Sequence, residues 1–173
     1  MSPNDLKQLI RDVPNFPKEG IIFKDITPVL KDPKALQFVT DELSSQLETS
    51  RPDLIVGIES RGFIFSPLLA YKLKAGFIPV RKKGKLPSRT LRTSYQLEYG
   101  ENELEIHEDA IFEGARVAVV DDLLATGGTA QAAIHLVEKL GGKVIGVSFL
   151  VELTFLKGRE KLAGYPTFSL IQY

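Results

Sequence analysis

The chain has 173 residues, of which 43% are hydrophobic and 25% are charged, a composition typical of one globular domain. Its 22 Lys and Arg residues balance its 22 Asp and Glu residues, so no general affinity for nucleic acid or anionic lipid is indicated. The absence of cysteine excludes disulfides and thiolate catalysis, and two histidines are too few for a histidine-rich metal site. We expect a cytoplasmic protein, because the N-terminus "MSPNDLKQLIRDV" resembles neither a signal peptide nor a membrane span.

The first part of the chain predicts two helices separated by a turn-rich stretch. Apolar residues at helical spacing predict a short helix over residues 6–13, before Pro14. Residues 15–27 then read as turns around a small apolar cluster. A second apolar face predicts a helix over residues 32–47, with Asp32 as its N-cap.

The remainder alternates between apolar runs and helical patterns. The runs lack polar alternation, which is typical of strands buried on both faces of a parallel sheet; they cover residues 53–58, 76–80, 116–120 and 143–151. Helices are predicted over residues 63–73 and 128–140, the second ended by Gly141. We therefore predict a single α/β domain over residues 1–173 with a doubly wound, mainly parallel sheet, and ligands beyond the carboxyl ends of its strands.

One region breaks the alternation. Residues 81–94 are basic and aperiodic, and residues 95–107 read as a β-hairpin that turns near residues 100–102. We predict that residues 82–108 form a flexible loop and hairpin lid over a site. The alternative is an ordinary surface loop.

The stretch "VAVVDDLLATGGTA" (residues 117–130) places two carboxylates before a glycine-rich turn that opens a helix. The turn offers backbone amides and hydroxyls to one phosphate group, whereas Asp121 and Asp122 accept hydrogen bonds from hydroxyl groups. A phosphorylated sugar satisfies both halves. The alternative is that the acids cap the strand and the glycines make a structural turn.

This stretch resembles the phosphoribosyl pyrophosphate (PRPP) signature of the type I phosphoribosyltransferases. The resemblance implies that the acidic pair, Asp121 and Asp122, binds the ribose diol. It also implies that the turn binds the 5′-phosphate through Ala125, Thr126, Gly127, Gly128 and Thr129.

Further segments are similar to the family in order along nearly the whole chain: "FPKEGIIFKDITPVL", "ESRGFIF", "PVRKKGKLP" and "YQLEYGENELEIH". Ala125 stands where members acting on 6-oxopurines carry an aspartate, which favours the members that act on adenine. The implied reaction is adenine plus PRPP giving AMP and pyrophosphate, in purine salvage. Mg²⁺ is implied, held mainly by PRPP with no protein ligand assigned, and so is a homodimer formed through the segment after "SRG".

The resemblance also assigns individual roles. Pyrophosphate binding falls on Ser60, Arg61, Arg81, Lys82 and Lys85. Adenine binding falls on Ile22, Phe23, Lys24 and Arg61, within a base-binding segment over about residues 1–30. Glu98 is the candidate general acid–base residue. In the alternative interpretation, the basic residues form a solvated surface, Phe23 belongs to the core, and Glu98 is one more exposed charge of the hairpin. The hairpin carries several such charges: Glu101, Glu103, Glu105 and Glu108.

Two other functions stay open at this point. One is a related enzyme acting on xanthine or another purine, and the other is a PRPP-sensing regulator without catalysis. The chain departs from the family at Ser66, where glycine is common. The histidines, His107 on the hairpin and His135 on an exposed helix face, receive no role.

Overall fold

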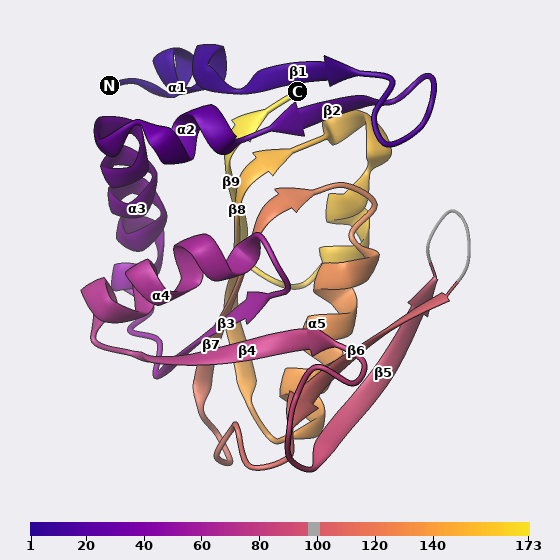
Figure 1. Cartoon of the computed structure of the whole chain (residues 1–173). Coiled ribbons are helices and arrows are strands. Elements are labelled where there is room, and N and C mark those ends of the chain that lie inside the picture. Colours follow the sequence, from indigo (N-terminus) through magenta and orange to yellow (C-terminus); the bar gives the residue numbers. More distant parts are fainter. Residues whose placement is uncertain (97–100) are drawn as a thin grey trace. The chain divides into compact units, whose positions relative to one another are not determined.

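A computed structural model describes residues 1–96 and 101–173, and the chain divides into two units, Met1–Glu42 and Leu43–Tyr173. The first unit holds two short helices, a two-stranded antiparallel sheet and the start of a longer helix (Figure 1). In chain order its elements are α1 (Pro3–Leu9), β1 (Arg11–Pro14), β2 (Ile22–Asp25), α2 (Thr27–Lys31) and the first part of α3 (Pro33–Glu48).

The predicted helix over residues 6–13 was wrong in its second half. The helix ends at Leu9, the backbone of Ile10 is extended, and Val13 lies in a strand. The reason is local, because the residue before a proline avoids helical backbone angles and Val13 precedes Pro14. The strand β2, inside the stretch expected to be turns, and the helix α2, which begins at the last residue of that stretch, were missed.

Two predicted helix boundaries are confirmed. The Asp32 carboxylate accepts hydrogen bonds from the amides of Lys34 (2.8 Å) and Ala35 (3.1 Å), as an N-cap does. The helix α5 ends at Lys139, and Gly141 follows with a left-handed φ of 84°. Both boundaries depend on signals within a few residues, which is why the sequence sufficed.

In the second unit, the described residues form a sheet of seven strands in the order β5–β6–β4–β3–β7–β8–β9. The strands are β3 (Leu54–Ile58), β4 (Gly76–Lys82), β5 (Thr90–Gln96), β6 (Glu101–His107), β7 (Arg116–Leu124), β8 (Lys143–Glu152) and β9 (Thr167–Gln172). Neighbouring strands are parallel along the series β4–β3–β7–β8–β9, whereas β6 is antiparallel to both β4 and β5. The mainly parallel sheet is confirmed, and β9 was not predicted.

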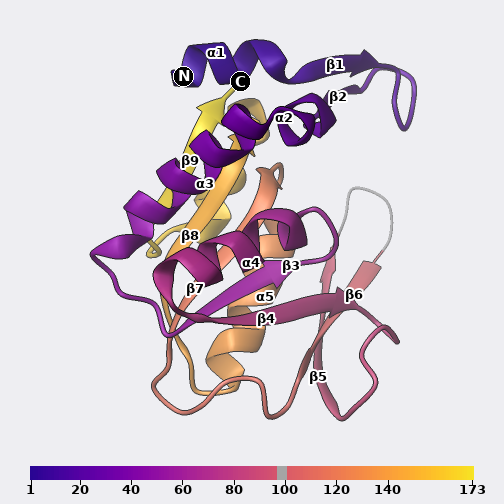
Figure 2. The ribbon, with the colours of Figure 1, turned by 60° about the vertical axis from the view of Figure 1, so that its left-hand side comes forward.

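Two helices cover opposite faces of this sheet (Figures 1 and 2). Val56 of β3 lies in the same buried cluster as Leu136 of α5 (Gly128–Lys139). The neighbouring Gly57 faces α4 (Gly62–Leu73), since a Cβ on Gly57 would lie 2.5 Å from Ser66 Oγ. Adjacent residues of a strand point to opposite faces, so the doubly wound arrangement is confirmed.

Ser66 itself is buried and donates a hydrogen bond to Gly62 O at 2.6 Å. The hydroxyl is therefore satisfied within the first turn of α4, and its side chain fills the space above Gly57. The departure at Ser66 thus has a packing explanation.

The hairpin is longer than predicted and is built into the sheet. Residues 90–94, expected to be irregular, belong to β5 and pair with β6. The turn was predicted near residues 100–102, yet Glu101 and Asn102 of β6 pair with Gln96 and Tyr95 of β5, and Gly100 lies outside the described residues. Leu104 and Ile106 are 1% and 0% exposed, so the base of the predicted lid belongs to the core.

Between β8 and β9 the chain forms two short 3₁₀ helices, η1 (Thr154–Leu156) and η2 (Gly158–Leu162). None of the helices formed by the described residues has the length and apolar character needed to cross a membrane.

Candidate active site

Three segments that the sequence singled out meet at one edge of the sheet. The strands β3, β4 and β7 are parallel, so their carboxyl ends lie at the same edge. The diphosphate segment (residues 59–62) follows β3, the basic loop (residues 81–86) begins at the end of β4, and the acidic pair lies near the end of β7. Contacts among these segments define a candidate site.

The diphosphate segment contacts the acidic pair directly. Arg61, immediately before α4, places Nε 2.9 Å from Asp122 Oδ2, and Asp122 is 3% exposed. A Cβ on Gly62 would lie 2.9 Å from both Asp121 Oδ1 and Val120 O. Only a glycine lets the start of α4 approach β7 this closely. The sequence-predicted Arg61 and acidic pair are therefore brought together.

The acidic pair is short of positive charge. Burial, followed by repulsion from Asp122, raises the pKa of Asp121 well above its ordinary value. Burial also raises the pKa of Asp122, although the Arg61 guanidinium opposes the shift. Asp121 Oδ1 accepts a hydrogen bond from Asp122 N at 2.9 Å, whereas Asp122 Oδ2 accepts none with good geometry from the described residues. A ligand bringing hydroxyl groups or positive charge would satisfy both acids.

The phosphate turn (residues 125–129) joins β7 to α5 as the sequence predicted. Gly127 is the N-cap of α5 with a left-handed φ of 80°, and no side chain among the described residues caps this end. The first amides of a helix have no partner within it, and together with the helix dipole they favour an anion. Gly127 and Gly128 are buried, while Thr126 and Thr129 are half-buried.

A second backbone segment, missed by the sequence analysis, lies directly against the phosphate turn. A Cβ on Gly127 would lie 2.4 Å from Gly158 O, and a Cβ on Gly158 would lie 2.1 Å from Ala125 O. Gly158 is the first residue of η2 and is buried. The only sequence signal was an unexplained glycine in "FLKGREKL".

The basic loop is organised by Glu59, to which the sequence analysis assigned no role. Glu59 Oε2 accepts hydrogen bonds from Arg81 Nε (3.2 Å) and Lys82 N (2.9 Å). Arg81 Nη1 in turn donates to Lys85 O at 3.0 Å. Two donors of Arg81 thus order the loop itself, and its predicted contact with pyrophosphate stays a prediction.

The hairpin charge Glu105 was expected to be exposed, and this was wrong. Its side chain is 0% exposed and accepts hydrogen bonds from Lys85 N (2.9 Å), Leu86 N (2.9 Å) and Arg92 Nε (3.1 Å). Burial alone would raise the pKa of Glu105, but these donors, together with the amide of Gly84, hold it below its ordinary value. The basic loop therefore closes over Glu105, because β6 lies between β4 and β5 rather than at the sheet edge.

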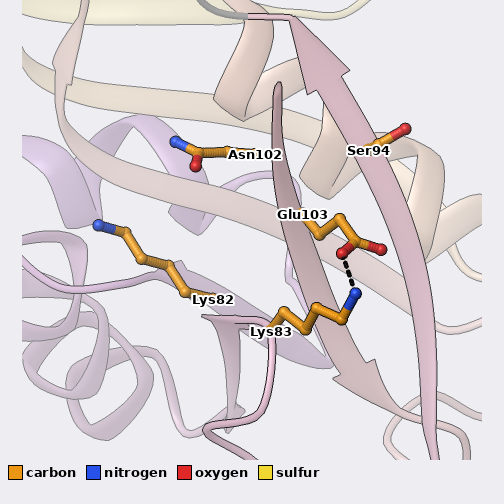
Figure 3. A pocket seen from close by; sticks show the side chains of 5 residues that line it. All are labelled: Lys82, Lys83, Ser94, Asn102 and Glu103. Carbon is orange, nitrogen blue, oxygen red and sulfur yellow. Dashed lines mark hydrogen bonds and ion pairs between the residues drawn. The ribbon is translucent and has the colours of Figure 1, made fainter. Parts of the chain in front are cut away.

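A pocket of about 570 Å³ opens beside this loop (Figure 3), lined by Lys82, Lys83, Ser94, Asn102 and Glu103. The ammonium of Lys83 pairs with Glu103, whereas Lys82 extends to the side toward which Asn102 points. The lining does not include the acidic pair or the phosphate turn. Contacts at the sheet edge, and not this volume, therefore define the candidate site.

Three of the four predicted adenine-binding residues lie in β2 of the first unit. Ile22 is 56% exposed, Phe23 packs edge to face on Phe16 at 5.2 Å between ring centroids, and Lys24 Nζ lies 2.6 Å from Asp12 Oδ1. Their contacts with a base stay predictions.

Two further predicted residues complete the account. Ser60 is exposed and follows a cis Glu59–Ser60 peptide bond. Glu98, the candidate acid–base residue, lies outside the described residues, so its role also stays a prediction.

Comparisons with known proteins agree with this geometry. The family model described as "phosphoribosyl transferase domain" matches residues 28–165. Adenine phosphoribosyltransferase of Clostridium botulinum (strain Loch Maree / Type A3) is 57% identical over 169 residues, which cover 98% of both chains.

Solved structures give the same result. The adenine phosphoribosyltransferase of Thermoanaerobacter pseudethanolicus has a TM-score of 0.97 and 56% identity, over 99% of this chain and 100% of that one. The Saccharomyces cerevisiae adenine phosphoribosyltransferase, solved with D-2,5-dideoxy-2,5-imino-altritol 1,6-bisphosphate and adenine, has a TM-score of 0.92 and 45% identity, over 97% of both chains.

Proposed function

This chain belongs to the phosphoribosyl transferase family, and from that premise we propose that it acts as an adenine phosphoribosyltransferase. This pentosyltransferase moves the 5-phosphoribosyl group of PRPP to adenine, giving AMP and pyrophosphate in purine salvage. The full-length relatives that carry this name support the substrate. The observation that carries the chemistry is the contact of Arg61 with Asp122, which joins a diphosphate segment to a sugar-binding acidic pair.

The ribose 5-phosphate half of PRPP binds across the end of β7. Asp121 and Asp122 accept hydrogen bonds from the ribose hydroxyls, and residues 125–129 hold the 5′-phosphate with backbone amides and threonine hydroxyls. Positive charge develops on the ribose as its bond to pyrophosphate breaks. The two carboxylates stabilise that charge, because they lie in a buried site short of cations.

The diphosphate half binds beside Arg61. Ser60 and Arg61 face it from the start of α4, and the cations Arg81, Lys82 and Lys85 receive the leaving pyrophosphate from the basic loop. Mg²⁺ bound together with PRPP would take most of its ligands from PRPP oxygens and would neutralise part of the diphosphate charge. No protein ligand is assigned to it.

Adenine binds against Phe23, with backbone groups of Ile22 and Lys24 reading its edge and Arg61 approaching from the diphosphate side. Glu98 acts as the general acid–base residue that exchanges a proton with the purine. Replacing Glu98 with glutamine lowers kcat by about a hundredfold or more, the usual contribution of general acid–base catalysis. An unchanged kcat would remove Glu98 from the mechanism.

The active species is a cytoplasmic homodimer formed through α4. Three apolar side chains lie one helical turn apart on this helix and remain exposed in the single chain: Ile64 (37%), Leu68 (37%) and Tyr71 (89%). An exposed apolar stripe of this kind suits a protein interface. Sedimentation that detects only the mass of one chain would contradict the dimer.

A panel of bases tests the proposed activity. Purified protein is supplied with PRPP and Mg²⁺ and with adenine, hypoxanthine, guanine or xanthine in turn. We expect AMP and pyrophosphate from adenine alone. Turnover of xanthine instead of adenine would support the related purine enzyme, and binding of PRPP without any nucleotide product would support the non-catalytic regulator.

A further inference from the structure

We propose that Gly158 and Arg159 are positioning residues for the 5′-phosphate of PRPP, acting through the phosphate turn and not by touching the substrate. This inference rests on the proposed function, because it concerns how that site holds one part of PRPP. The backbones of Gly127 and Gly158 lie in direct contact.

The two glycines leave no room for a side chain on either one. A Cβ built on Gly127 would lie 2.4 Å from Gly158 O. A Cβ built on Gly158 would lie 2.1 Å from Ala125 O and 2.9 Å from Gly127 N. Real Cβ atoms do not approach backbone atoms this closely. The backbone of η2 therefore sets the position of residues 125–127 by direct contact.

Gly158 is glycine for lack of space, not for its backbone conformation. Its φ does not lie in the left-handed region, whereas the preceding Lys157 has a φ of 53° and carries a full side chain. An alanine at position 158 would thus adopt the native backbone angles without strain. Its methyl group would instead push against the carbonyl of Ala125 and displace the phosphate turn.

Arg159 fixes Gly158 to the sheet. Its Nε donates to Glu152 Oε1 at 3.0 Å, its Nη2 donates to the other oxygen of Glu152, and its Nη1 donates to Thr167 O at 2.6 Å. Glu152 is 4% exposed, and the Arg159 hydrogen bond lowers its pKa. Because this two-pronged pair joins η2 to the end of β8, and Arg159 also contacts the first residue of β9, Gly158 is held against the turn.

Displacing the phosphate turn should affect the binding of only one end of PRPP. Amides at the start of α5 bind one phosphate well only when they converge on it, and a displacement of about 1 Å can cost about a hundredfold in a bound complex. The diphosphate half of PRPP is held by other segments. A change at Gly158 should therefore weaken binding of the 5′-phosphate end and leave the pyrophosphate end unaltered.

Gly158→Ala tests this, with ribose 5-phosphate and pyrophosphate as separate competitive inhibitors of AMP formation. We expect the inhibition constant of ribose 5-phosphate and the KM for PRPP to rise by about ten- to a hundredfold. The inhibition constant of pyrophosphate and the KM for adenine should stay within about twofold. Equal weakening of both inhibitors would indicate a general structural role and overturn the proposal.

Gly146→Ala is the matched control. Gly146 is also buried, but a Cβ there would meet the flexible end of Leu47 at 3.1 Å and Pro166 O only at an ordinary contact distance of 3.9 Å. This variant should bind both inhibitors as the native chain does. The melting temperatures of Gly158→Ala and Gly146→Ala show how much stability each variant loses, so that a loss of binding can be compared at a similar loss of stability. Weakening of ribose 5-phosphate binding by Gly146→Ala to the same extent would also overturn the proposal.

Arg159→Lys provides the second variant, which decides the matter if Gly158→Ala does not fold. Lysine keeps the charge opposite Glu152 but cannot make the two-pronged contact, so ribose 5-phosphate should weaken about tenfold with pyrophosphate unaffected. Unchanged ribose 5-phosphate binding would count against the proposal. Calorimetric titration with ribose 5-phosphate separates this failure from failure of the proposed function, since it needs no turnover.

Discussion

The phosphate turn and the basic loop, which the proposed function assigns to opposite ends of PRPP, are held in place by different forces. The turn rests on backbone packed against backbone, at Gly127 and Gly158, where not even a methyl group fits. The loop rests on two carboxylates, Glu59 and Glu105, that accept hydrogen bonds from its amides and from the Arg81 guanidinium.

The difference suits what each region is proposed to bind. A single phosphate on a helix N-terminus needs amides in fixed positions, and close packing of backbone against backbone supplies that rigidity. A leaving pyrophosphate needs several cations gathered in one place, and carboxylates gather them while neutralising part of their mutual repulsion. The turn should therefore tolerate no added volume, whereas the loop should be sensitive to changes of charge at Glu59 and Glu105.

The largest expected effect tests the packing. Gly127→Ala places a Cβ against Gly158 O on a backbone with φ of 80°, so we expect the dissociation constant of ribose 5-phosphate to rise by about a hundredfold or more. Gly114→Ala is the control, because Gly114 has nearly the same φ, 77°, with nothing within 4 Å of its Cβ. Similar losses of ribose 5-phosphate binding in both variants would show that backbone strain, and not contact with Gly158, governs the turn.

The second effect tests the carboxylates. Glu105→Gln keeps the shape but removes the charge facing Arg92, Lys85 N and Leu86 N, so pyrophosphate should bind about tenfold more weakly while ribose 5-phosphate is unaffected. Glu103→Gln, a change of the same kind nearer the surface, is the control. Weakening of ribose 5-phosphate to an equal degree would mean that the two regions are not held independently.

The native Glu105 also predicts a pH dependence. Because its pKa is lowered in the folded chain, its contribution to stability is present above the ordinary glutamate pKa and is lost as pH falls through the lowered value. Unfolding followed across acidic pH should show a weaker acid dependence in Glu105→Gln than in the native chain. Parallel curves for the two proteins would contradict this assignment.

A third, smaller effect concerns the acidic pair between the two regions. The pKa of Asp121 is raised, so the folded chain keeps its proton at pH values where the unfolded chain has lost it. Stability therefore falls as pH rises through that interval and stays lower above it. Asp121→Asn removes this cost and should raise Tm by roughly 2–4 °C at mildly alkaline pH, while PRPP binding is lost. A gain of equal size in acid, below the ordinary aspartate pKa, would argue against the electrostatic explanation.

The sequence was sufficient where the structural cause is local or strongly periodic. Four apolar runs predicted β3, β4, β7 and β8, and the single stretch of residues 117–130 predicted the acidic pair, the phosphate turn and the start of α5. The strand β9 was missed because "TFSLIQ" mixes polar and apolar residues, as its half-buried place at the edge of the sheet allows.

The sequence failed where the cause lies far along the chain. Glu105 looks like the other hairpin glutamates, and only the return of residues 85 and 86 over β6 distinguishes it. The need for glycine at position 158 arises from Ala125 and Gly127, about thirty residues earlier. Motifs thus predicted the groups that are proposed to bind the ligand, whereas the groups that position them became visible only from tertiary contacts.

The smallest expected effect on pyrophosphate binding lies at Lys83, which neither of the two carboxylates that hold the basic loop is expected to position. The basic loop also includes this lysine, but its ammonium pairs with Glu103 and its side chain is 57% exposed. Exposed pairs of this kind contribute about 0–1 kcal/mol, and the ion pair of the Lys83 ammonium in the described part of the chain is with Glu103, not with Glu59 or Glu105. Lys83→Gln should therefore change the inhibition constant of pyrophosphate by less than about twofold, against a much larger rise for Lys82→Gln. If Lys83→Gln weakened pyrophosphate as strongly, the total charge of the loop would matter more than the positions that Glu59 and Glu105 impose on it.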